Sequence, residues 1–198
     1  MDKRKLEVKY NQLVKRIDTI KKHFDFQQGI NGLTPLQNDK IKGFLLLCHA
    51  EIESYLEDLA LSLLDDACTR WRNHHIANYN LASLFLDSVR IEKKDTVQTR
   101  SEQIILTYRN EVQKNNHGIK SDNIKKLFYP LGYMNDDFDS AFLATLDSFG
   151  ADRGRVAHTT GRTSTVYDKQ TEFDRVDYLI TSLHDFQEVL ITKANSNS

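Results

Sequence analysis

The feature that most constrains the fold is a long stretch, from Asp39 to Trp71, in which apolar residues recur every three or four positions. This spacing predicts one long helix. One side of it carries Ile41, Leu45, Cys48, Ile52, Leu56, Leu59 and Leu63. The other side carries Leu46, Leu47, Leu61 and Leu64. A helix that is apolar on both sides lies at the centre of its own domain or is shared across a dimer interface.

The rest of the chain predicts further helices and no strands. Helical spacing covers residues 1–27, 104–112 and 135–149, shorter helices are expected near 81–86 and 121–128, and a closing helix is expected over 171–190. The alternating pattern of a half-buried strand is absent over any useful length. We therefore expect an all-α, up-and-down bundle of about five to seven helices, with residues 1–198 forming one domain and residues 193–198 a frayed tail.

The composition is that of an ordinary folded protein, with 39% hydrophobic residues, 28% charged residues and a formal net charge of −1. A chain so close to neutral gives no overall attraction to nucleic acid, so a polyanion would have to bind a local patch. The longest apolar run, near Phe44 to Cys48, is far too short to span a bilayer. Cys48 and Cys68 lie about 30 Å apart on the predicted long helix and cannot pair with each other. We expect a cytoplasmic protein that does not contact a membrane.

Several motifs that define enzyme classes are missing from the sequence. It has no P-loop, no dinucleotide-binding glycine motif and no nucleophile-elbow serine motif. Cys68, His74 and His75 lack the close pair of cysteines and the further ligand that a zinc site needs. We therefore expect no metal site and no other cofactor.

An arginine followed after four to six residues by a histidine occurs three times, at Arg16/His23, Arg70/His75 and Arg153/His158. The first two pairs fall within predicted helices. The third falls in Asp-Arg-Gly-Arg-Val-Ala-His, residues 152–158, where Gly150 and Gly154 predict a turn before the last helix. On a regular helix, positions five apart point about 140° apart. Arg153 and His158 can therefore meet at one phosphate only if the backbone leaves helical geometry or another chain completes the site.

The motif and its setting resemble the HEPN superfamily of helical ribonucleases and nucleotide-binding proteins, and most of all its RiboL-PSP-type branch. The resemblance rests on Arg153-x4-His158, the upstream helix Cys48–Leu59 and the closing helix, and it covers about residues 38–190. It implies a homodimer in which two Arg–His motifs face one RNA-sized cleft. Members often act as toxins or in phage defence, so an antitoxin or another defence protein is a further candidate partner. Other members are inactive binding modules.

The resemblance also implies metal-independent cleavage of RNA, in which the ribose 2′-hydroxyl attacks the scissile phosphate and leaves a 2′,3′-cyclic phosphate. His158 would exchange protons near neutral pH. Arg153 would stabilise the charge that builds on the phosphate. Gly154 departs from the family, in which a polar residue often follows the arginine. Arg155 is the candidate to compensate, because it lies three residues before His158 and would share its face in a helix.

Further candidate residues surround the motif. Thr159, Thr160 and Arg162 form part of a hydroxyl-rich loop that could hold backbone phosphates together with Arg155. His49 and Glu53 lie four apart on the long helix, where they could orient each other and support the site. The alternatives are structural. Arg153 would pair with Asp152 or with a helix C-terminus, and His158 would be an ordinary loop histidine. His49 and Glu53 would be a satisfied pair at the edge of the core.

Two other functions stay open from the sequence. One is a non-catalytic helical module that binds RNA, a nucleotide or a partner protein and uses Arg153, Arg155 and Arg162 only to contact phosphates. The other is an interaction scaffold built on the two-sided apolar helix. Catalysis needs a titrating histidine, whereas phosphate binding weakens with salt and does not require His158.

Overall fold

The computed structural model describes residues 3–27, 32–87, 96–158 and 165–196. Its α-helices are α1 (Lys3–Phe24), α2 (Pro35–His74), α3 (Tyr79–Asp87), α4 (Val97–Asn110), α5 (Ser121–Phe128), α6 (Ser140–His158) and α7 (Lys169–Ser196). A short π-helix, η1 (Glu111–Asn115), continues α4, and a 3₁₀ turn, η2 (Asn135–Asp137), precedes α6. The prediction of an all-α fold of five to seven helices is confirmed.

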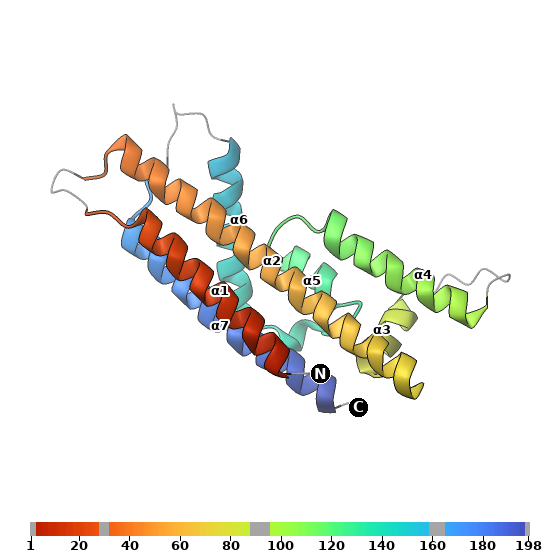
Figure 1. Ribbon diagram of the computed structural model, residues 1–198. Helices are drawn as coiled ribbons and strands as arrows, with labels where there is room; N and C mark the ends of the chain where they lie inside the picture. The colour runs from red at the N-terminus through yellow and green to blue at the C-terminus, as the bar shows by residue number, and fades with distance from the viewer. Residues whose placement is uncertain (1–2, 28–31, 88–95, 159–164, 197–198) are drawn as a thin grey trace.

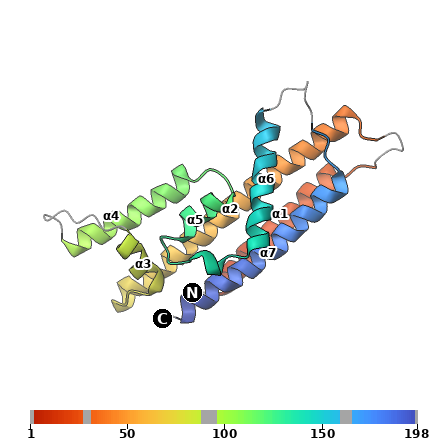
Figure 2. The same ribbon diagram turned by 180° about the vertical axis from the view of Figure 1, so that it is seen from behind.

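The helices are arranged around α2. Helices α1, α2 and α7 run side by side along the length of the molecule, and the two chain ends lie close together at one end (Figure 1). Helix α6 crosses α2 at a steep angle, which Figure 2 shows from behind. Helices α3, α4 and α5 gather around the C-terminal half of α2. Each described helix other than α4 therefore has α2 or α7 as a close neighbour.

Helix α2 begins and ends with local signals that the sequence supplies. The Thr34 hydroxyl accepts a hydrogen bond from the backbone N–H of Gln37 (3.2 Å), and the Gln37 side chain accepts one from the N–H of Thr34 (2.9 Å). Pro35 follows at the first helical position, where no N–H is needed. His75 ends the helix in the left-handed conformation, with a φ of 55°. The helix is thus about 60 Å long and extends beyond the predicted 39–71 at both ends.

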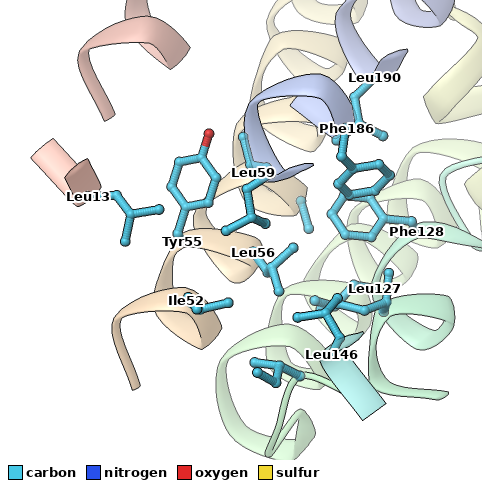
Figure 3. Close-up of a cluster of buried hydrophobic side chains, with 14 of the residues drawn as sticks. Leu13, Ile52, Tyr55, Leu56, Leu59, Leu127, Phe128, Leu146, Phe186 and Leu190 are labelled. Carbon is cyan, nitrogen blue, oxygen red and sulfur yellow. The ribbon is translucent and has the colours of Figure 1, made fainter. Parts of the chain in front are cut away.

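The core lies mainly on one side of α2. All seven apolar residues predicted for that side are buried: Ile41, Leu45, Cys48, Ile52, Leu56, Leu59 and Leu63. Figure 3 shows part of this core, where α2 residues meet Leu13 of α1, Phe128 of α5 and Phe186 of α7. On the other side Leu64 is buried but Leu47 is 40% exposed. The central position of α2 is confirmed, and its sharing across a dimer stays a prediction.

The last two helices begin at different residues from those predicted. Helix α6 is capped by Asp139, whose carboxylate accepts from the N–H of Phe142 (2.7 Å), and the acids at 135–137 lie in η2 instead. Helix α7 is capped by Asp168, which accepts from the N–H of Thr171 (2.8 Å). Aspartate, asparagine, serine and threonine all cap helices well, so a run of them fixes a helix start only to within a few residues.

The C-terminal end of the chain is more ordered than predicted. Helix α7 continues to Ser196, Lys193 forms an ion pair with Asp137, and Ala194 is 2% exposed. The prediction of a frayed tail is therefore wrong up to residue 196, because tertiary contacts hold a segment whose composition is polar. Residues 197–198 lie outside the described residues. The prediction that residues 1–198 form one domain stays a prediction.

Two simpler expectations concern the cysteines and the membrane. Cys48 and Cys68 both lie on α2 and do not pair with each other, as predicted, and the structure shows that both are buried. Among the helices described, none combines the length and the apolar character needed to cross a bilayer.

Candidate active site

The predicted turn around the Arg–His motif is not formed. Helix α6 continues through Gly150 and Gly154 as far as His158. A glycine inside a helix costs about 1 kcal/mol relative to alanine. Tertiary contacts on the same stretch outweigh this cost, because Phe149 is 1% exposed and Asp152 is 6% exposed, the latter in ion pairs. The prediction of a glycine-bounded turn is therefore wrong.

The regular helix limits what one chain can do with the motif. Positions 153 and 158 of a regular helix project about 140° apart. The backbone between Arg153 and His158 stays helical, so local geometry does not bring the two positions to one phosphate. Completion of the site by another chain stays a prediction.

Ion pairing separates Arg153 from the arginines of the other two Arg–His pairs. Arg16 pairs with Glu51 (Nε–Oε1 2.8 Å) and Arg70 pairs with Asp66 (Nε–Oδ2 3.0 Å). Arg153 is exposed and forms no ion pair with any residue that the structure describes. The predicted alternative, in which Arg153 pairs with its neighbour Asp152, is wrong because other arginines hold that carboxylate.

Asp152 is the centre of a buried network that joins α6 to α7. Its Oδ2 accepts from Nη1 of Arg175 (2.7 Å), and its Oδ1 pairs with Arg155. Nη2 of Arg175 lies 2.5 Å from Oε2 of Glu172, and its guanidinium carbon lies 4.9 Å from the Phe149 ring centre. Burial raises the pKa of Glu172, although Arg175 opposes this. The network fixes the last turns of α6 against the start of α7 and leaves Arg153 outside it.

His49 and Glu53 of α2 lie beside this part of α6. The His49 ring is buried and stacks with Phe149 (centroids 6.3 Å apart, planes at 16°). Nδ1 of His49 lies 3.6 Å from Oε2 of Glu53, whose Oε1 accepts from the backbone N–H of Gly118. Burial, together with the positive charge of Arg153, lowers the pKa of His49 to about 4. His49 is therefore neutral near pH 7, and its support of the site stays a prediction.

The low pKa of His49 predicts a loss of stability in acid. The neutral ring is favoured in the folded state, so its contribution is complete above the unfolded pKa of about 6.5 and is lost as the pH falls toward 4. The full loss is on the order of 3 kcal/mol. Urea unfolding of the wild type and of His49→Gln from pH 7.5 to 4 checks this. Equal slopes of the unfolding free energy against pH would contradict it.

The remaining predicted site residues divide into two groups. Arg155 pairs with Asp152 while its side chain stays 62% exposed, and its position shares a helix face with that of His158. A peripheral phosphate contact through Arg155 therefore stays a prediction. Thr159, Thr160 and Arg162 lie outside the described residues.

Two further features lie away from the motif. A groove of about 630 Å³ separates α4 and η1 from α5, with Tyr108 and Leu127 among its lining residues. Three side chains, Glu7 of α1 and His184 and Glu188 of α7, each place one atom that can bind a metal ion within 4.8 Å of the other two. Neither feature contains a residue of the Arg–His motif.

Sequence reasoning missed the side chains that position the end of α6. Glu172 and Arg175 are three apart on α7, which indicates a salt bridge along that helix. Nothing in the sequence indicates that the same arginine reaches Asp152, because that contact joins two helices. The stacking of His49 on Phe149 has no local signal either.

The comparison with protein families agrees with the fold. The family model RiboL-PSP-HEPN matches residues 11–195. The match begins inside α1 and ends inside α7, so it extends beyond the 38–190 on which the resemblance rested. The comparisons with curated proteins and with solved structures returned no match. The chain therefore belongs to the RiboL-PSP-HEPN family, and its helices form a HEPN-superfamily domain of nuclease- and RNA-related type.

Proposed function

We propose that the protein is a metal-independent endoribonuclease whose active sites combine Arg153 of one chain with His158 of a second copy. The observation that supports this most is the contrast between the cations of α6 and α7. Arg155 and Arg175 are held by Asp152, while Arg153 is exposed with no acidic partner among the described residues. An unpaired guanidinium beside a buried, neutral His49 is suited to bind a phosphate.

The reaction follows from the chemistry of these two side chains. His158 takes the proton of a ribose 2′-hydroxyl, and the 2′-oxygen attacks the adjacent phosphorus. The bond from phosphorus to the 5′-oxygen breaks, and that oxygen takes a proton from protonated His158 or from water. The products are a 2′,3′-cyclic phosphate and a 5′-hydroxyl. Arg153 donates hydrogen bonds to the phosphate oxygens, on which negative charge increases in the transition state.

The biological setting belongs to the same proposal. A ribonuclease of this kind would act as a toxin or as an antiphage effector, held in check by an antitoxin or another defence protein. Arg155, Arg162, Thr159 and Thr160 would contact RNA phosphates next to the cleaved one. His49 and Glu53 would support Arg153 from α2.

RNA cleavage in excess EDTA tests the proposal. The purified protein is expected to cut single-stranded RNA in EDTA, with a rate that follows the ionisation of a histidine and with 2′,3′-cyclic phosphate ends on the upstream product. An RNA with a 2′-deoxyribose at the cut site is the matched control, because it lacks the nucleophile. Cleavage of that control, or cleavage that stops in EDTA, would rule out this mechanism.

The second candidate function is RNA binding without catalysis. Gly154 favours it, because a glycine follows the motif arginine where active relatives often carry a polar residue. Under this alternative the wild type binds RNA in a salt-dependent manner, leaves it uncut, and keeps its affinity when His158 is replaced. The EDTA assay and a binding assay on the same RNA separate the two functions.

A further inference from the structure

The two glycines of α6 have different surroundings, and these point to a residue outside the motif. A Cβ at Gly150 would lie 2.9 Å from Cγ and 3.5 Å from Cε of Lys120. The aliphatic part of Lys120 therefore crosses α6 where the helix has no side chain. A Cβ at Gly154 would have no neighbour within 4 Å among the residues that the structure describes. The helix is thus covered by a lysine at one glycine and bare at the next.

The segment that carries Lys120 is fixed on both sides. The Ser121 N–H and hydroxyl donate to the two carboxylate oxygens of Asp147 on α6 (2.7 and 3.0 Å). The N–H of Gly118 donates to Glu53 of α2. Ile119, between these anchors, is fully buried. The backbone at Lys120 is therefore held in place, while the residue itself is exposed.

Lys120 and Arg153 lie along the same face of α6. Positions 150 and 153 are three apart, so their Cβ directions lie about 5–6 Å from each other on one face. Neither Lys120 nor Arg153 forms an ion pair within the described ranges. The nearby carboxylates of Asp147 and Glu53 accept hydrogen bonds from Ser121 and Gly118 instead. Two cations without acidic partners among the described residues thus lie on this face, Lys120 across the buried Gly150 and Arg153 next to the open Gly154.

We propose that Lys120 is a second RNA-phosphate-binding residue, which contacts a phosphate next to the one held by Arg153 along the Gly150–Gly154 face of α6. This inference rests on the proposed RNA-directed function, but it does not require that the RNA is cut. The open helix surface at Gly154 lets a phosphodiester backbone approach closely, and a lysine supplies a point charge for a phosphate without reading the base.

The test is binding of a non-cleavable, 2′-O-methyl RNA oligonucleotide to wild type, Lys120→Gln and Lys126→Gln at several salt concentrations. Lys126 is also exposed, on the neighbouring helix α5, and is the matched control. Loss of one phosphate contact is expected to reduce the slope of log K against log salt by about 0.7 and to weaken binding several-fold at low salt. Lys126→Gln should behave as wild type.

A second variant, Gly150→Ala, keeps the positive charge of Lys120 but displaces its side chain. Gly150→Ala places a Cβ against the stem of Lys120, so it should weaken binding in the same direction as Lys120→Gln. Wild-type affinity and salt slope in Lys120→Gln, or an equal loss in Lys126→Gln, would overturn the inference. If the wild type binds but does not cut RNA, the catalytic proposal fails while a selective loss in Lys120→Gln still supports this contact. A wild type that binds no RNA overturns both.

Discussion

Replacing His158 with alanine is expected to lower kcat for RNA cleavage by about 10²–10⁴-fold, because the variant loses its general acid–base group. Replacing Arg153 with alanine should cost about 10²–10³-fold, since one set of charge-stabilising donors at the phosphate is removed. The two variants should differ from each other in their affinity for non-cleavable RNA. His158→Ala should keep most of its affinity, whereas Arg153→Ala should lose a phosphate contact and part of the salt dependence.

The matched controls for these two variants lie at the far end of α2. His74 and Arg72 are exposed residues in the last turn of that helix and have no part in the proposed site. Alanine at either position should leave kcat unchanged. A His158→Ala preparation that cuts RNA as fast as the His74→Ala preparation would show that His158 is not the catalytic group.

Replacing Arg175 with methionine is expected to lower the free energy of unfolding by about 3–5 kcal/mol. The change removes the cation that both Asp152 and Glu172 share, and each of these acidic residues is 6% exposed. Asp152 then keeps only the exposed Arg155 as a cation, and Glu172 loses the cation that faces it, which is costly because a buried carboxylate lacks hydration. Methionine keeps an apolar side chain of similar length against the Phe149 ring. The loss in the free energy of unfolding therefore comes mainly from the missing positive charge.

Arg16→Met is the control for this loss, because it removes an ion pair at the surface. The Arg16 side chain is 52% exposed, and a pair of that kind contributes at most about 1 kcal/mol. Urea unfolding of both variants at pH 7 makes the comparison. A loss in Arg175→Met no larger than that in Arg16→Met would show that the Asp152 network does not hold α6 against α7.

The helices were predictable because their signals are local and repeated. All seven residues that the apolar spacing assigned to the main side of α2 are buried, although Phe44, Tyr55 and Ala60 are buried as well and were not assigned to it. Helix starts were less certain, because Asp139 and Asp168 compete with other good caps a few residues away. The C-terminal end was misjudged because the ion pair of Lys193 with Asp137 joins parts of the chain that are 56 residues apart.

The geometry of the site was harder to predict than its residues. Gly150 and Gly154 are typical of a turn, but α6 continues through both. The reason is tertiary: Lys120 lies across Gly150, and Arg175 holds Asp152 from another helix. Helix propensity is a weak preference that such contacts override. The motif itself was visible in the sequence, whereas the lysine and arginine that surround it depend on the fold.

The helical geometry of α6 makes the central claim specific: Arg153 and His158 act together from different chains. Mixing the inactive variants Arg153→Ala and His158→Ala under conditions that exchange subunits tests this directly. A heterodimer of the two has one site with both alanines and one site with wild-type Arg153 and His158. Random exchange should therefore restore about a quarter of wild-type activity, because half of the dimers carry one intact site out of two. A mixture as inactive as its two components would contradict the shared site.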